Sequence, residues 1–232
     1  MGSRASFLPS NRITGYRLVN SRFPPIRLFD DVASPEEFEA LYAIQARTNP
    51  RMLCELGRLE LIPRTEIPFG IPGFSYATAP FTHINPDGSR FSRGEYGVLY
   101  IADEIRTALA EVAYHQQRYW KGVIGKKFDR VMLRGLACTF DEEHMLDVTG
   151  VAEDDPIMRS DDYSAAQQLG VTARRSGRSG IRYRSVRRPG NICWALLTPK
   201  PVEAIKQIAH YEMLWDGSEI AAINQLKVLH SR

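Results

Sequence analysis

Residues 88–115 read GSRFSRGEYGVLYIADEIRTALAEVAYH, a glycine-containing segment followed by a short apolar run and a longer amphipathic stretch. The glycines predict a turn, and Val98–Ala102 (VLYIA) predicts a short buried strand. Asp103 can cap a helix that extends to about Tyr119. Apolar residues recur along this helix at the spacing of a core-facing stripe, at Ile105, Ala108, Leu109 and Val112. The stretch therefore predicts a turn–strand–helix unit.

Three side chains of this unit carry chemistry: Arg90, Tyr100 and Glu111. Arginine binds phosphate or carboxylate with a planar fork, tyrosine offers an aromatic face, and glutamate can stabilise a cation or activate a hydroxyl. Together they suit a substrate with a pyrophosphate, a flat ring and an electrophilic sugar carbon, as in a nicotinamide dinucleotide. Taken alone, a tyrosine at the position of Tyr100 is more often a core residue, and a glutamate at the position of Glu111 is more often a solvated helix residue.

The composition is that of a soluble globular protein. The chain has 232 residues, of which 44% are hydrophobic and 25% charged, and a net charge of +3. This charge is too small to indicate nucleic-acid binding by itself. No apolar run approaches the roughly 20 residues that cross a bilayer, and the N-terminus lacks the apolar centre of a secretory signal. We therefore expect a cytoplasmic protein that does not span a membrane.

Cysteine and histidine usage indicates neither disulfides nor a metal site. Cys54, Cys138 and Cys193 are isolated, and the sequence has no CxxC pair and no HExxH motif. Isolated cysteines of this kind are typical of reduced, buried thiols. We expect no bound metal.

The first part of the chain predicts few regular elements. Residues 1–15 resemble a flexible tail, and a strand begins at Tyr16 and ends before Pro24. A helix begins near Ser34, and a further strand is expected at Arg58–Pro63. The Pro- and Gly-rich residues 64–96 show no clear period and predict a long irregular segment. Because this segment contains the arginine at position 90, we expect it to be functional.

The second part predicts paired strands and a separate helix. Strands are expected at 131–140, 181–186, 192–197 and 203–215, with the second and third of these antiparallel neighbours. A helix is expected from Asp161 to Ala173. This mixture favours a single α+β domain, residues 16–232, with mixed, mainly antiparallel sheets and flanking helices.

The chain resembles the RES-domain family, whose members act mostly as toxins of bacterial toxin–antitoxin pairs. The resemblance rests on the Ser89–Ser92 turn with its following strand and helix, on Tyr16-Arg17, and on GIRYRSVRRPGN, which contains Ser185. These motifs occur in the family's order and extend over about residues 16–200. The family often has Gly-Gly-Arg-Trp-Asn at the first turn, where this chain has Ser, Phe and Ser around the arginine. Phe in place of Trp keeps an apolar anchor, and Ser in place of Asn shortens the hydrogen-bonding reach.

The resemblance implies a fold similar to ADP-ribosylating toxins, with NAD+ bound as substrate in a cleft between sheets. It implies cleavage of NAD+ by phosphorolysis or hydrolysis, in which inorganic phosphate or water accepts ADP-ribose. It also implies a cognate helix-turn-helix (Xre-type) antitoxin that occupies the cleft. We expect a homodimer that meets nucleic acid only through this antitoxin.

The resemblance also implies roles for individual residues. Glu111 would stabilise positive charge on the ribose during loss of nicotinamide, as carboxylates do in glycosidases. Arg90 would bind the pyrophosphate or an attacking phosphate, and Tyr100 would stack on nicotinamide or its ribose. These three are the predicted catalytic residues.

Four further residues are predicted to bind the substrate. Arg17 would share the pyrophosphate, Tyr16 belongs to the same motif, and Ser185 would hydrogen-bond the nicotinamide or a ribose edge. His83 is an additional candidate because it precedes the arginine turn in the irregular segment, although a solvated loop histidine is the simpler interpretation.

Two other functions remain open from the sequence. A mono-ADP-ribosyltransferase that modifies an acceptor protein would share the first half of the reaction. The arginine-rich residues 174–188 could instead belong to a basic nucleic-acid-binding regulator. No aromatic stacking motif, zinc pattern or helix-turn-helix accompanies them, so we rank attraction of an anion or a partner protein first. A Rossmann oxidoreductase is disfavoured, because no GxGxxG lies between a strand and a helix.

Overall fold

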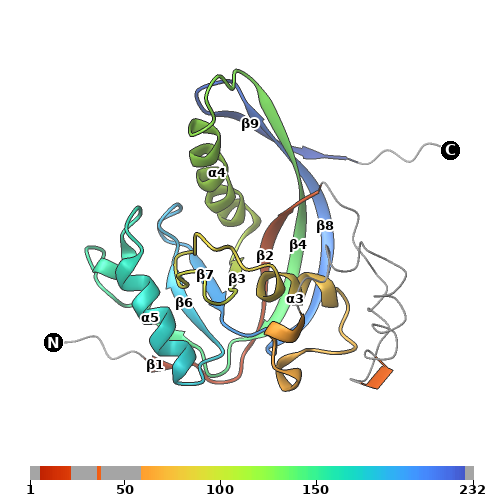
Figure 1. Cartoon of the computed structure of the whole chain (residues 1–232), viewed down its shortest axis with the longest axis vertical. Coiled ribbons are helices and arrows are strands. Elements are labelled where there is room, and N and C mark those ends of the chain that lie inside the picture. Colours follow the sequence, from red (N-terminus) through yellow and green to blue (C-terminus); the bar gives the residue numbers. More distant parts are fainter. Residues whose placement is uncertain (1–5, 22–35, 38–58, 228–232) are drawn as a thin grey trace.

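A computed structural model describes residues 6–21, 36–37 and 59–227 of the chain. Their strands form one sheet in the order β1-β5-β6-β7-β3-β2-β4-β8-β9 (Figure 1), in which only the β5–β6 pair is parallel. The α+β architecture with a mixed, mainly antiparallel sheet is thus confirmed. The strands are β1 Ser6–Phe7, β2 Arg12–Asn20, β3 Leu99–Ala102, β4 Asp129–Asp141, β5 Leu146–Asp147, β6 Gly180–Arg184, β7 Ile192–Leu196, β8 Val202–Trp215 and β9 Ile220–Leu226.

Three α-helices lie against the sheet in the described part of the chain: α3 Phe74–Thr82, α4 Ile105–Lys121 and α5 Ser164–Arg175. Helices α4 and α5 pack against one core cluster, to which they contribute Ala108 and Ala166 among others. Helix α3 packs against a second cluster through Phe74 and Phe81. The short 3-10 helices are η1 Leu59–Leu61, η2 Arg64–Glu66 and η3 Pro156–Met158.

The sheet is nearly divided where β2 meets β3. These two strands share one residue pair, Tyr16 with Ala102, whereas β2 pairs with β4 along its whole length, from Arg12 to Asn20. One part of the sheet is therefore β1-β5-β6-β7-β3 and the other is β2-β4-β8-β9, and α4 contacts both β2 and β3 at the joint.

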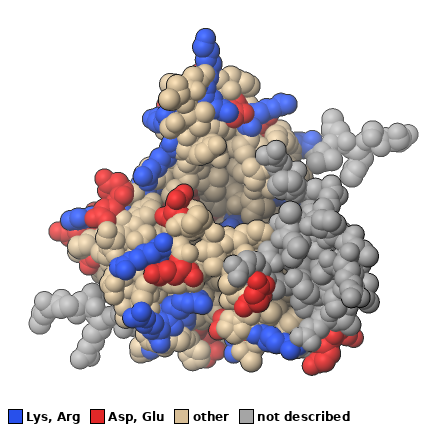
Figure 2. Space-filling model, viewed as in Figure 1, with Lys and Arg blue, Asp and Glu red and all other residues tan. Residues whose placement is uncertain are grey.

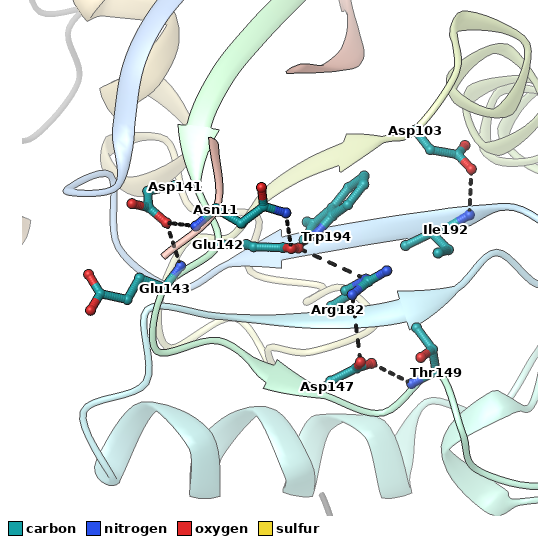
Figure 3. A network of polar contacts seen from close by, with 10 residues as sticks. All are labelled: Asn11, Asp103, Asp141, Glu142, Glu143, Asp147, Thr149, Arg182, Ile192 and Trp194. Atoms are coloured by element: carbon teal, nitrogen blue, oxygen red, sulfur yellow. Dashed lines mark hydrogen bonds and ion pairs between the residues drawn. The ribbon is translucent and has the colours of Figure 1, made fainter. Parts of the chain in front are cut away.

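A buried polar network fixes the first part of the sheet (Figure 3). The Glu142 side chain, 4% exposed, accepts hydrogen bonds from Asn11 Nδ2 at 2.8 Å and from Trp194 Nε1 at 2.9 Å. Arg182 lies between Glu142 and Asp147, with N–O distances of 3.9 and 3.7 Å. Because a buried carboxylate is costly unless it is hydrogen-bonded, this network specifies how β5, β6 and β7 meet the start of β2.

Three predictions for the first part of the chain need correction. Residues 6–7 and 12–15 belong to β1 and β2, so the predicted tail through residue 15 is wrong from Ser6 onward. Cross-strand pairing with β4 and β5 forms these strands, and local apolar pattern adds little. The strand predicted at Arg58–Pro63 is instead the 3-10 helix η1, and the segment 64–96 contains α3. Of the helix predicted near Ser34, the structure describes Glu36 and Glu37, which are helical; the rest of it and Cys54 lie outside the described residues.

The strands and the helix predicted for the second part of the chain are confirmed. The prediction did not include strands β5 and β9. The predicted strand and helix of the 88–115 unit correspond to β3 and α4. Asp103 is not the N-cap of α4, because Glu104 occupies that position. The Asp103 carboxylate instead accepts hydrogen bonds from Thr107 Oγ1 at 2.9 Å and from the Ile192 amide at 2.8 Å, which anchors the start of α4 to β7.

Candidate active site

Glu111 and Ser185 are joined by a short hydrogen bond, although they lie far apart in the sequence. Ser185 Oγ donates to Glu111 Oε1 at 2.6 Å. Glu111 lies in the middle of α4, beside the apolar stripe that packs on the core. Ser185 follows β6 directly, and its side chain is only 3% exposed. The fold therefore brings a carboxylate from α4 and a hydroxyl from the β6–β7 connection to one place.

The hydroxyl of Ser185 is oriented by its own surroundings. Its Oγ accepts hydrogen bonds from the backbone amides of Arg187 at 3.2 Å and Arg188 at 3.0 Å. A hydroxyl has two lone pairs and one proton, so the proton is left for the carboxylate of Glu111. This geometry makes Ser185 a residue that positions Glu111, whereas the sequence predicted a direct bond to substrate.

Arg90 is a buried cation without an acidic partner among the described residues. Its side chain is 7% exposed, and Nη1 donates to the carbonyls of Ile157 at 3.2 Å and Arg159 at 3.0 Å. Its Cζ lies 4.6 Å from the centre of the Tyr163 ring. Burial of a charge without a counter-charge is costly, so these surroundings favour an anionic ligand.

Tyr100 supports the turn that carries Arg90. Its hydroxyl donates to Ser89 Oγ at 2.9 Å and accepts from the Phe91 amide at 3.0 Å, so it holds the turn on both sides of the arginine. Burial raises the pKa of Tyr100 to about 12, against the opposing effects of these hydrogen bonds and of the Arg90 charge. The phenol is therefore a neutral positioning group at physiological pH.

Tyr183 is a buried phenol whose pKa responds to all three predicted catalytic residues. Burial raises the pKa of Tyr183 well above its ordinary value, and the nearby Glu111 and Tyr100 raise it further, while Arg90 lowers it. The Tyr183 ring also meets the Phe91 ring edge-on, with 4.9 Å between centroids. The charges of all three groups therefore act on the same buried phenol.

Tyr16 and Arg17 lie on opposite faces of β2, because successive side chains of a strand alternate. Tyr16 packs with the same core cluster as Tyr100, whereas Ile13 and Val19, on the face of Arg17, pack with the other cluster. Arg17 Nη1 donates to the Tyr100 carbonyl oxygen at 3.1 Å, and burial lowers the pKa of Arg17. The structure thus connects Arg17 to Tyr100 through the backbone and separates it from Tyr16.

His83 lies at the C-terminal end of α3, away from the turn that follows it. Its Nδ1 is 3.1 Å from Thr82 Oγ1 and 3.3 Å from the Ala79 carbonyl, so the ring is bound to its own helix. The face of the sheet that α3 covers is opposite to the one that α4 covers. This placement favours a helix-end role for His83.

Arg187 adds a second cation that was absent from the sequence prediction. Its Nη2 donates to the Ser160 carbonyl, and its Cζ lies 3.3 Å from the centre of the Tyr114 ring. Its Nε is buried and has no hydrogen-bond partner in the part of the chain that the structure describes. The signal available from sequence was its position two residues after Ser185, in a connection that was already assigned to the site.

His115 lies one turn after Glu111 on α4 and faces the same arginines. Its side chain keeps contact with solvent, yet partial burial and the charges of Arg187, Arg90 and Arg118 lower its pKa. A histidine among three guanidinium groups is held in its neutral form near physiological pH. It can therefore accept or donate a hydrogen bond beside Glu111 without adding to the positive charge.

Charge and metal chemistry limit what the site can do. Figure 2 shows basic and acidic side chains interspersed over the lower part of one face, so no continuous basic stripe covers it. Within the described ranges, no group of three or more His, Cys, Asp or Glu side chains is arranged to hold a metal ion.

None of the described helices combines the length and apolar character required to cross a bilayer. Surface hollows of about 680 and 570 Å³ lie against Trp215 and Tyr96, apart from Glu111.

Comparison with known proteins gives three findings. The family model described as RES domain matches residues 67–216. The uncharacterised protein y4oC of Sinorhizobium fredii (strain NBRC 101917 / NGR234) is 30% identical over 212 residues, which cover 90% of this chain and 85% of that protein. The chain is also similar to a chain of the M. tuberculosis MbcT–MbcA toxin–antitoxin complex, at 12% identity and a TM-score of 0.41, covering 86% of this chain and 85% of that one.

Proposed function

This chain belongs to the RES domain family, and on that basis we propose that it is the toxin of a toxin–antitoxin pair and cleaves NAD+ at the nicotinamide–ribose bond. The matched residues include Arg90, Tyr100, Glu111 and Ser185, so the family comparison and the site cover the same part of the chain. A cognate helix-turn-helix antitoxin would inhibit the enzyme by occupying the site.

The observation that carries the proposal is the carboxylate of Glu111, which Ser185 orients, together with the buried guanidinium of Arg90. Ser185 holds Oε1 of Glu111 at 2.6 Å, and Arg90 lies in the same surroundings without an acidic partner among the described residues. A fixed carboxylate suits a developing positive charge, and buried arginines suit a diphosphate. NAD+ carries both of these features in one molecule.

The reaction we propose breaks the bond between ribose C1′ and the nicotinamide nitrogen. The bonding electron pair leaves with nicotinamide, which becomes neutral, and positive charge develops on the ribose. The carboxylate of Glu111 stabilises this charge and orients the incoming nucleophile or a ribose hydroxyl. Water or inorganic phosphate then forms the new bond to C1′ and releases its proton.

The carbonyl oxygens of residues 157–160 occupy the arginine donors to which a diphosphate would bind. The carbonyl oxygens of Ile157, Arg159 and Ser160 accept hydrogen bonds from Arg90 and Arg187. Phosphate oxygens offer the same donors a stronger, charge-assisted bond than a neutral carbonyl does. We therefore expect NAD+ to displace this segment from the two arginines.

The test is chromatography of NAD+ products from the purified protein, with and without inorganic phosphate. The proposal predicts release of nicotinamide together with ADP-ribose or its phosphate, and a loss of about 100-fold or more for Glu111→Gln. Glu203→Gln on the surface of β8 is the matched control and should keep full activity, since the ion pair of Glu203 within the described residues is with the exposed Arg12. Absence of nicotinamide release from the wild-type protein would reject the proposal. Label transferred from NAD+ to protein would identify a transferase instead.

A further inference from the structure

Strand β9 is the outer strand of the sheet, and none of the described strands pairs with its free side. The register of β8 and β9 places Ala222 to Leu226 opposite Leu214 to His210, and an extra residue near Ala221 interrupts the pairing before them. The Ile220 amide is bonded to Gln117 Oε1 at 3.1 Å, but no described residue pairs with the outer edge of the strand after it. A row of backbone donors and acceptors is therefore open to another chain.

Side chains that usually prevent such pairing are missing from β9. Its sequence is IAAINQL, without a charged residue, proline or glycine between Ile220 and Leu226. Proteins normally protect outer strands with lysine, proline or very short length. Ile223 pairs with Met213 and shares its face of the sheet, yet 41% of its surface is exposed. An uncharged outer strand with a half-exposed isoleucine is typical of a strand that pairs with a strand of another chain.

We propose that two copies of this chain pair through β9, antiparallel and about a twofold axis at Ile223. The opposite edge of the sheet is β1, which has two residues, so pairing of β9 with β1 of another copy would be short and would lead to open-ended assembly. Pairing of β9 with itself closes after two copies. Since the strand is uncharged, bringing two of them together costs no charge repulsion.

The axis is placed at Ile223 because this brings the two exposed isoleucines opposite each other. Directly opposed side chains of an antiparallel pair lie about 4.5–5.5 Å apart at Cβ, and apolar pairs at this position stabilise the sheet. The pairing also aligns Ala222 of one copy with Asn224 of the other, and neither residue is charged. This inference is independent of NAD+ chemistry and rests on the outer strand alone.

The test uses the mass of the full-length chain in solution. Multi-angle light scattering should give twice the chain mass of 26.3 kDa for the wild type, and the single mass for Ile223→Lys and for Ile223→Glu. An equimolar mixture of these two variants should return to the dimer, because opposite charges then meet across the axis. Ile208→Lys is the control, since Ile208 is 49% exposed on β8 and is not paired with β9.

A second variant keeps the test decisive if the charged substitutions disturb folding. Ile223→Cys should form an intermolecular disulfide under mild oxidation, because the two positions face each other, and Ile208→Cys should not. A wild-type chain of single mass would overturn the proposal. The same holds for a dimer that survives Ile223→Lys, or for one that Ile208→Lys disrupts equally.

Discussion

A serine hydroxyl has one proton, and the fate of that proton distinguishes two roles for Ser185. Both lone pairs of Oγ accept backbone amides, so the proton is committed to Glu111. We expect Ser185→Ala to lower kcat by roughly 10- to 100-fold, the equivalent of one hydrogen bond to a charged group, with little change in KM. Steady-state kinetics of NAD+ cleavage would measure both constants. A raised KM with unchanged kcat would instead support direct substrate binding by Ser185.

His115 gives the site a dependence of stability on pH. Its pKa in the folded protein lies below the value of 6.5 for the free side chain, so at mildly acidic pH the unfolded chain binds more protons at this position. Stability contributed by neutral His115 is therefore present above pH 6.5 and is lost as pH falls below it. Urea unfolding at pH 7.5 and 5.5 should show a decrease for the wild type that is smaller in His115→Gln. The effect should be modest, because the ring keeps contact with solvent; an equal decrease in both proteins would contradict it.

At the scale of elements, a glycine of α5 sets the distance between this helix and the arginine turn. A Cβ at Gly170 would lie 2.0 Å from the carbonyl oxygen of Phe91, so the backbone of the turn would have to move. Alanine raises helix propensity by about 1 kcal/mol, but overpacking costs about 1–3 kcal/mol and displaces Arg90 as well. We expect Gly170→Ala to lower both the unfolding free energy and NAD+ cleavage. Gly122→Ala at the end of α4 should have a much smaller effect on both, since its Cβ would lie 3.3 Å from the Tyr119 carbonyl oxygen, which requires a shift of only a few tenths of an ångström.

The elements that sequence predicted well are those with a strong local pattern. The apolar run of β3 and the stripe of α4 were predicted from residues 98–119, and the strand at 181–186 corresponds to β6. Helix α3 was missed although Phe74, Ala77 and Phe81 have helical spacing, because Pro80 and the flanking glycines dominate the segment. Strands β1, β5 and β9 depend on pairing with distant residues, which no local window contains.

The site could be predicted in part for the same reason. Arg90, Tyr100 and Glu111 were identified from the motifs of residues 88–115, and the charges of all three act on the pKa of one buried tyrosine, Tyr183. The bond between Glu111 and the serine of the β6–β7 connection depends on how α4 crosses the sheet, which spacing does not encode. The second arginine, at position 187, was missed because arginines are frequent in that segment and only its neighbours in space distinguish it.

At the scale of the whole molecule, the candidate site lies at the weakest joint of the sheet. The parts that contain β3 and β2 meet through a single residue pair, and Tyr100 and Arg17 bond across that joint. Few backbone hydrogen bonds cross this joint, whereas β4 and β8 pair over a long register, so we expect the joint to open at a lower free energy than the second part of the sheet. We therefore expect a ligand to shift the boundary between β2 and β3 more than it shifts the β4–β8 pairing.

The absence of a side chain at Gly15 allows β2 and β3 to approach closely at this joint. A Cβ at Gly15 would lie 2.5 Å from Ile101 Cγ2 and 2.8 Å from the Ala102 carbonyl oxygen, so β2 and β3 would have to separate. Overpacking of this kind costs about 1–3 kcal/mol, and here it also shifts Tyr100 relative to Glu111. We expect Gly15→Ala to reduce the unfolding free energy by that amount and to reduce NAD+ cleavage in the folded fraction.

The matched control for this prediction lies within the rigid part of the sheet. A Cβ at Gly135 on β4 would meet the Tyr211 ring at 2.8 Å, and a side chain can move away more easily than a backbone carbonyl can. Gly135→Ala should therefore destabilise the fold without a specific loss of turnover. Denaturant unfolding and NAD+ cleavage measured on both variants separate the two effects, because only a change at the joint should lower turnover more than stability accounts for. Equal behaviour of the two variants would mean that the boundary between β2 and β3 has no particular part in catalysis.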